Sequence, residues 1–296
     1  MRAVLQSALA DLAEVPAVSR WVRSGDLRLH VLDYGGDGVP LVVLPGITSP
    51  AVTMDFVARE LTDLVRPIVV DVRGRGLSDS GKSYTLEDYA DDTVAVLDGL
   101  GLDRPLLLGH SMGARIAAVT AALLSHRWLS ACSATAFSHR TCLGVPLRGT
   151  VLVDPPMSGP GRGPYPTTLE AFLGQVEQAQ RGTDADEVAR SWPRWPRREQ
   201  ELRARWLSSC DAEAIAATHA GFESEDFFAT WSQVPTPTVL VYGGESPVVT
   251  AEGAAEAAAA NPGARLVEVP GAGHMVFWDE TAAALDTLRK ILAQLS

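Results

Sequence analysis

A serine stands between two glycines at a point where an apolar, strand-like run gives way to a long helical pattern. The run LLL at 106–108 leads into GHSMG at 109–113, and an apolar stretch rich in alanine follows. This G-x-S-x-G spacing between a strand and a helix is typical of a nucleophile elbow. Glycines at the flanking positions avoid collisions between side chains and backbone, and the helix N-terminus favours developing negative charge. We therefore predict that Ser111 is a nucleophile.

A serine hydroxyl is a weak nucleophile unless a base removes its proton and an acid orients that base. Among the six histidines, His274 alone lies after the last predicted strand and before the last predicted helix, in VPGAGHMVFWDE. This position fits the chain order serine, acid, histidine, so we predict that His274 is the base. His110 is adjacent to the serine but is expected to serve in packing.

Two strand ends could supply the acid. Asp154 ends the run TVLV and precedes two prolines that stop the strand, whereas Glu245 lies in the loop after VLVYGG. We favour Asp154, because a strand tip fixes a carboxylate better than a flexible loop does, and we expect it within hydrogen-bond distance of the His274 imidazole. The alternative is that Asp154 only ends its strand in a turn.

Backbone N–H groups would complete the site by stabilising an oxyanion. In VVLPGITSP a strand ends at 45–46, so the N–H of Ile47 can face the same space as the N–H of Met112. Such donors contribute on the order of 3 kcal/mol each to the transition state. The neighbouring Thr48 and Ser49 are expected to add polar contacts to a substrate.

These residues require a scaffold of strands and helices in alternation. Short runs such as PLVVLPG, RPIVVDVRG, PLLLGHS and PTVLVYGG alternate with longer helical patterns, which predicts an α/β fold with a mostly parallel, doubly wound sheet. From about residue 156 to 233 the sequence is Gly/Pro-rich and then charged and helical, with no convincing strand. We predict a helical cap at 156–233, inserted into a core formed by 1–155 and 234–296.

Composition limits the class of partner. The chain has 296 residues and a net charge of −11, which argues against nucleic acid or an anionic membrane surface but not against a small anionic substrate. No apolar run reaches the length of a membrane span, and no secretory segment is recognised, so we expect a soluble cytoplasmic protein. No sequence feature indicates an oligomeric state.

The cysteines do not indicate a disulfide framework or a metal site. They number three, lack C-x-x-C spacing, and two of them fall in a long Ser-, Cys- and His-rich stretch at 125–148, at positions 132 and 142. Together with His126 and His139, those two cysteines match no zinc pattern. We expect no metal, and we expect 125–148 to be a surface excursion or a disordered loop.

The chain resembles the α/β-hydrolase superfamily over nearly its whole length. Within it, the strings LPGITSPAVTMDFVAREL, VVDVRGRGLSDSG, LLGHSMGAR, VLVDPPMSGPGRGPYP and GAGHMVFWD are similar to the N-formylmaleamate deformylases of bacterial nicotinic acid degradation. By motif match, this resemblance implies a catalytic triad of Ser111, His274 and Asp154. It also implies hydrolysis of N-formylmaleamate to maleamate and formate through a formyl-serine, with no metal or organic cofactor.

That substrate carries a carboxylate, which needs a partner. Arg162, with Tyr165 nearby, lies at the predicted entrance of the cap and is our candidate, although an exposed loop arginine is an equal alternative. Arg73 and Arg75 are expected to be structural. Two other functions stay open: a carboxylesterase or C–C bond hydrolase acting on another small acid, and a non-catalytic module that binds a small ligand. Labelling of Ser111 by a fluorophosphonate and turnover of any substrate would separate them.

Overall fold

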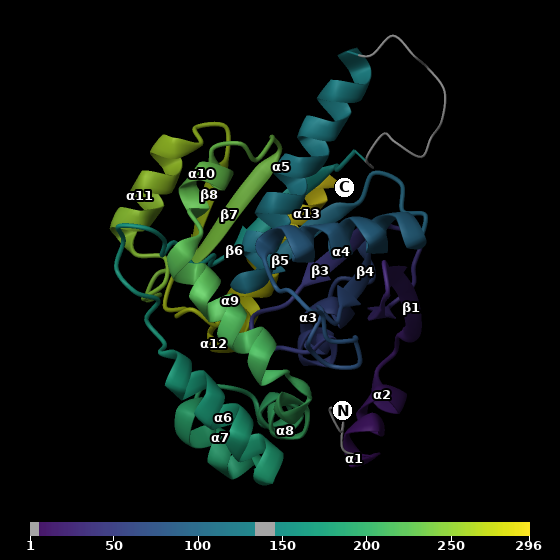
Figure 1. Ribbon diagram of the computed structural model, residues 1–296, viewed down its shortest axis with the longest axis vertical. Coiled ribbons are helices and arrows are strands. Elements are labelled where there is room, and N and C mark those ends of the chain that lie inside the picture. Colours follow the sequence, from purple (N-terminus) through teal and green to yellow (C-terminus); the bar gives the residue numbers. More distant parts are fainter. Residues whose placement is uncertain (1–5, 134–145) are drawn as a thin grey trace.

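A single eight-stranded sheet runs through the protein (Figure 1). The computed structural model describes residues 6–133 and 146–296. The strand order is β1-β2-β4-β3-β5-β6-β7-β8. The pairs β1–β2 and β2–β4 are antiparallel, and every following pair in this order, from β4–β3 to β7–β8, is parallel. The strands are β1 (Val18–Ser24), β2 (Leu27–Asp33), β3 (Val39–Leu44), β4 (Val65–Val70), β5 (Leu106–His110), β6 (Gly149–Val153), β7 (Thr238–Gly243) and β8 (Arg265–Val269). The predicted α/β fold with a mostly parallel sheet is thus confirmed.

Both faces of the sheet are buried, because successive side chains of the central strands enter different cores. In β3, Val42 and Leu44 join one apolar cluster while Leu41 and Val43 join the other. The first cluster includes side chains of α4 (Leu86–Gly99), α5 (Met112–Ser133) and α11 (Ala251–Ala260). The second includes side chains of η1 (Ala51–Met54), α3 (Asp55–Arg59), α12 (Val276–Asp279) and α13 (Thr281–Leu295). Two short helices, α1 (Gln6–Leu9) and α2 (Asp11–Glu14), precede β1.

All regular structure between β6 and β7 is helical. The segments are α6 (Leu169–Arg181), α7 (Ala185–Ser191), α8 (Arg197–Trp206), η2 (Leu207–Ser209), α9 (Ala212–Ser224) and α10 (Phe227–Trp231). Four of the helices begin at an N-cap whose side chain accepts a backbone N–H, and these caps are Thr168, Asp184, Asp211 and Asp226. In Figure 1, α6, α7 and α8 lie below the sheet, and α9 and α10 lead back beside α5.

The last two of these helices, α9 and α10, pack with the helices that cover one face of the sheet. Phe222 of α9 and Trp231 of α10 belong to the apolar cluster that α4 and α5 share. The helical content of 156–233 agrees with the sequence pattern, while the division into cap and core stays a prediction.

The long stretch at 125–148 differs from expectation in its first part. Residues 125–133 continue α5, which projects beyond the sheet in Figure 1, instead of forming a loop. The reason is the helix-forming pattern of the preceding turns, which continues through this point. Residues 134–145, with Cys142 and His139, lie outside the described residues.

Candidate active site

Ser111 occupies a sharp turn between β5 and α5. Its φ is +55°, in the left-handed region, and its N–H donates to the Val153 carbonyl at 2.8 Å. A Cβ at Gly109 would overlap the backbone of Gly113, and a Cβ at Gly113 would overlap the carbonyl of Leu44. Glycine is therefore required on both sides of the turn, as the spacing predicted.

His274 lies between Ser111 and Asp154. Its Nε2 is 3.0 Å from Ser111 Oγ, and its Nδ1 is 2.7 Å from Asp154 Oδ2. The expected contact between Asp154 and the imidazole is present. Glu245 instead is exposed and lies 3.9 Å from Arg194, so the structure does not bring it to His274.

The carboxylate of Asp154 is fully buried and held by neutral donors. It follows β6, with φ +49°, and the exposed fraction of the residue is 0%. The Gly243 N–H donates to Oδ1 at 3.1 Å and the Ser246 hydroxyl donates to Oδ2 at 2.6 Å. These bonds fix the carboxylate against the imidazole, because both donors come from the end of the neighbouring strand β7 and its loop.

Arg75 connects the two residues proposed for the oxyanion hole. It is 0% exposed, its Nε donates to the Ile47 carbonyl at 3.0 Å, and its Nη2 is 3.5 Å from Met112 Sδ. The same guanidinium bonds to the hydroxyls of Tyr89 at 2.6 Å and Thr218 at 3.0 Å. Arg75 therefore anchors the Ile47 carbonyl, which lies in the peptide unit that follows the Ile47 N–H, and so supports the loop after β3. The structural role expected for Arg75 includes this contact.

A small pocket of about 50 Å³ opens at Ser111 and His274. Thr48 and Ser49 line it, as expected, and so does Tyr165, whose hydroxyl is 3.2 Å from His274 Nε2. Burial raises the pKa of Tyr165 far above its usual value, so the hydroxyl remains a hydrogen-bond donor. Pockets for drug-sized ligands measure about 300–1,000 Å³, so this one fits a compact group.

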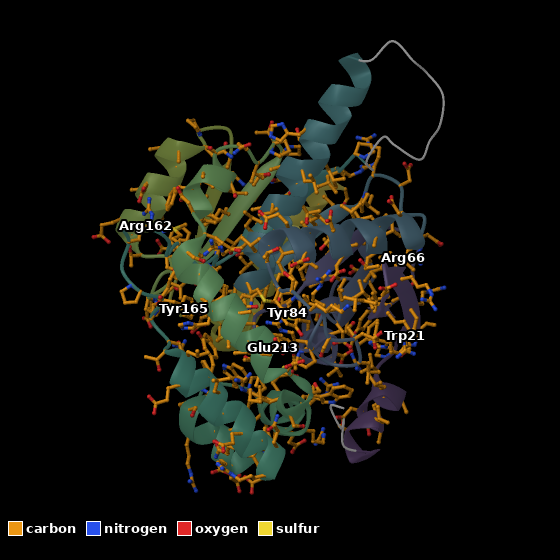
Figure 2. The ribbon with its side chains drawn as sticks, viewed as in Figure 1. Trp21, Arg66, Tyr84, Arg162, Tyr165 and Glu213 are labelled. Atoms are coloured by element: carbon orange, nitrogen blue, oxygen red, sulfur yellow. The ribbon has the colours of Figure 1, made fainter. Side chains whose placement is uncertain are left out.

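The structure corrects the expectation for Arg162. Its guanidinium bonds to both oxygens of Glu256 on α11, at 2.5 and 2.9 Å, and lies 4.0 Å from the ring centre of Phe228. It lines a separate hollow beside α11, and Figure 2 shows it at the outer margin of the molecule. The local chain turns the Arg162 side chain outward, although Tyr165, three residues on, points inward.

A different arginine, which sequence reasoning missed, lines the pocket. Arg203 of α8 is 6% exposed; its Nη2 donates to Gln175 Oε1 at 2.7 Å and its Nη1 lies 3.4 Å from Thr48 Oγ1. Burial lowers the pKa of Arg203 to about 10, so the group stays charged at neutral pH. The helical spacing of Glu199, Arg203 and Trp206 on one face was the signal that could have shown its burial.

His110 fulfils the packing role expected of it. Its Nε2 donates to the His274 carbonyl at 3.0 Å, and its ring lies 5.5 Å from that of Trp278. Burial lowers the pKa of His110 to about 3, so the imidazole is neutral. In this way His110 supports the loop that carries the candidate base.

Within 6–133 and 146–296, no group of three or more His, Cys, Asp or Glu residues is arranged to hold a metal ion. Over the same residues, no helix is long and apolar enough to cross a membrane.

Comparison with known proteins identifies the family and relatives whose reactions are named. Residues 41–286 match the model of the alpha/beta hydrolase family. An N-formylmaleamate deformylase of Pseudomonas putida is 38% identical over 262 residues, which cover 88% of this chain and 90% of the relative. A 2-(acetamidomethylene)succinate hydrolase of Mesorhizobium japonicum is 30% identical over 286 residues, covering 90% and 92%. The crystal structure of an N-formylmaleamic acid deformylase from another Pseudomonas putida strain superposes with a TM-score of 0.80 at 36% identity, covering 92% of this chain and all of that one.

Proposed function

The chain belongs to the alpha/beta hydrolase family, and we propose that it hydrolyses N-formylmaleamate to maleamate and formate. The observation that carries the proposal is the continuous contact from Ser111 through His274 to Asp154 at the wall of a small pocket. Similarity over nearly the whole chain to a named N-formylmaleamate deformylase suggests the substrate.

In the first half-reaction His274 acts as the base. Its Nδ1 proton is held by Asp154, so Nε2 is the nitrogen that takes the proton of Ser111. The serine oxygen attacks the formyl carbon, which bears only hydrogen and is open to attack. The oxygen of the former carbonyl becomes an oxyanion, which the N–H groups of Ile47 and Met112 stabilise.

His274 then returns the proton to the departing nitrogen, and the C–N bond breaks. Maleamate leaves as a carboxamide, which departs more readily than a simple amine because the substrate is an imide. The Tyr165 hydroxyl, close to Nε2, can donate to the leaving group. Water deprotonated by His274 attacks the formyl-serine, releases formate and restores the Ser111 hydroxyl.

The helices of 156–233 act in this proposal as a cap. Tyr165 and Arg203 reach from this segment to residues of the core, with Tyr165 contacting His274 and Arg203 contacting Thr48. The pocket is therefore closed by the segment that separates β6 from β7, and the substrate is enclosed between 156–233 and the flanking parts of the chain.

A second candidate substrate is 2-(acetamidomethylene)succinate, the substrate named for the Mesorhizobium relative. Hydrolysis of its acetamido group would also break an acyl C–N bond, and it would use the same three residues. The small volume beside Ser111 favours the formyl group over the larger acetyl group.

Formate release from N-formylmaleamate by purified protein tests the proposal. We expect turnover by wild type and by Glu245→Gln, and loss of turnover in Ser111→Ala and Asp154→Asn. Acetate release from 2-(acetamidomethylene)succinate, measured in parallel, ranks the two substrates. The absence of formate, with a fluorophosphonate still attaching to Ser111, would reject the substrate and keep the hydrolase.

A further inference from the structure

Arg203 is a buried cation that meets no carboxylate in the described parts of the chain. Its hydrogen-bond partners are the amide of Gln175 and the hydroxyl of Thr48, both neutral, and the Cys210 thiol is also near enough to interact with its charge. Arg73, also buried, forms a two-point ion pair with Asp92 at 2.6 and 2.8 Å. A buried arginine without an anionic partner is unusual, because desolvating the charge is costly unless a counter-charge offsets it.

The guanidinium lies at the wall of the pocket that holds Ser111. It is the charged side chain in that wall, which contains no aspartate or glutamate among the residues described. The rings of Trp192 and Trp195, stacked on each other at 4.7 Å, lie to one side of it, each with its centre 5.8 Å from the guanidinium carbon. These flat apolar neighbours restrict water and leave the pocket side open to an incoming group.

The remaining groups around Arg203 are hydrogen-bond donors. The hydroxyls of Thr48 and Ser49 line the pocket. The indole N–H of Trp192, which also lines it, is buried and has no hydrogen-bond partner within the described residues. A site that contains a cation, several neutral hydrogen-bond donors and no competing anion is suited to binding a carboxylate.

We infer that Arg203 binds the carboxylate of the substrate and makes the enzyme selective for short acyl amides that end in an anion. The inference rests on the proposed function, which supplies such a substrate. Thr48 follows Ile47 directly, so the anion site lies next to the position proposed for the oxyanion. The short maleyl chain suits this spacing: with its carboxylate on Arg203, the formyl carbon is directed to Ser111.

Kinetics with an anionic and a neutral substrate test this role. We expect Arg203→Met to lower kcat/KM for N-formylmaleamate by about 100-fold or more, mainly through KM, because one partner of a buried charge pair is removed. Turnover of neutral p-nitrophenyl acetate should change by no more than about threefold, which also shows that the variant folds. Arg203→Lys should fall between, since it keeps the charge but loses the planar fork.

Arg162→Gln is the matched control, because that arginine is paired with Glu256 outside the pocket. It should leave both substrates unaffected. An equal loss on the two substrates in Arg203→Met, or a loss as small as that of Arg162→Gln, would overturn the inference.

Binding of maleate, measured by calorimetry, separates this inference from the proposed function. Wild type and Arg162→Gln should bind maleate and Arg203→Met should not, whether or not N-formylmaleamate is hydrolysed. Maleate binding by wild type without formate release would reject the deformylase assignment and keep the anion site. Absence of maleate binding by wild type would reject the anion site itself.

Discussion

In the described parts of the chain, two histidines each lie between a serine and an aspartate, and the two sets of distances are the same. In the candidate active site, His274 lies 3.0 Å from Ser111 and 2.7 Å from Asp154. In the other, His30 lies 3.0 Å from Ser19 Oγ and 2.7 Å from Asp71 Oδ2. Both histidines use Nε2 toward the serine and Nδ1 toward the carboxylate.

The backbone around each serine is what differs. Ser111 sits in a left-handed turn at the head of α5 and opens on a pocket. Ser19 lies within β1, an edge strand, where it is exposed and paired with Leu32. Its neighbours continue the strand, so no helix N-terminus stands behind it. Because the same three side-chain contacts occur at both serines, the contacts alone do not identify a nucleophile. We propose that the turn, the helix end and the pocket make the difference at Ser111.

The aspartates also differ in what they hold. Asp71 accepts the backbone N–H groups of Ala51 and Leu77 in addition to the His30 ring, so it joins two loops to a strand. Asp154 receives a hydroxyl and a single backbone N–H from the adjoining strand end. We interpret the group around His30 as a structural anchor.

The largest predicted difference concerns the two serines. Ser111→Ala should lower kcat for N-formylmaleamate by about 10⁴-fold or more, because the nucleophile is removed, while Ser19→Ala should stay within about twofold of wild type. Formate release and fluorophosphonate labelling, run on both variants, measure this. Labelling that survives in Ser111→Ala and disappears in Ser19→Ala would reverse the assignment.

The aspartates should separate catalysis from stability. Asp154→Asn should lower kcat by about 10⁴-fold through the wrong imidazole tautomer, with little change in unfolding. Asp71→Asn should lower the free energy of unfolding by about 1–3 kcal/mol, since it weakens buried backbone bonds, and change kcat by less than about tenfold. Steady-state kinetics and urea unfolding of both variants provide the comparison. Equal effects of the two substitutions on kcat would contradict it.

A smaller effect is expected from Arg75, which bonds to the Ile47 carbonyl as well as to Tyr89 and Thr218. Arg75→Met should lower kcat by about 10–100-fold with little change in KM, because the loop that presents the Ile47 N–H loses the anchor at its Ile47 carbonyl. Arg73→Met, which breaks the pair with Asp92, should act mainly on unfolding, by about 3–5 kcal/mol. If kcat falls equally in both at a temperature where both are folded, the Ile47 contact is not what matters.

The smallest effect is predicted for the aromatic neighbour of each histidine. Tyr165→Phe removes the hydroxyl near His274 and should lower kcat/KM by about 2–10-fold, the value of one hydrogen bond. Trp21, whose ring centre lies 5.1 Å from that of His30, is the counterpart, and Trp21→Phe should leave kcat/KM unchanged. Initial rates measured in parallel for the two variants test this prediction. An equal change of kcat/KM in both would contradict the different roles given to the two histidines.

The elbow and the base were predictable because local pattern specifies them. GHSMG between a strand and a helix identifies Ser111, and the loop before the last helix identifies His274. Asp154 followed from its place at a strand end, because neighbouring parallel strands end at the same edge of a sheet. The contacts among these three residues depend on the strand order β5-β6-β7-β8 and on the loop after β8, neither of which the alternation of elements specifies.

Arg203 could not be found in this way, because its position depends on how α8 packs over the loop after β3. The helical spacing in RREQELRARW could indicate that Arg203 is buried, but it does not show that its side chain faces Thr48 and the pocket. For Arg162 the alternative given with the candidate, an arginine outside the pocket, agrees with its pairing to Glu256, which no local sequence feature specifies. The contacts of His30 with Ser19 and Asp71 depend on the register of β1 and β2 and on the loop that contains Asp71. No sequence motif marks either feature, so these contacts could not be predicted.

The order in which the chain is synthesised bears on when the site can exist. Ser111 and Asp154 are separated from His274 by 163 and 120 positions, and His274 falls in the last tenth of the chain. Long-range contacts of this kind form late, and a nascent chain folds from its N-terminus. A nascent chain that has not been synthesised as far as His274 holds Ser111 and Asp154 but lacks the proposed base. Under the proposed mechanism such a chain would be inactive, and the helix α13 that packs on the sheet is synthesised only after that histidine.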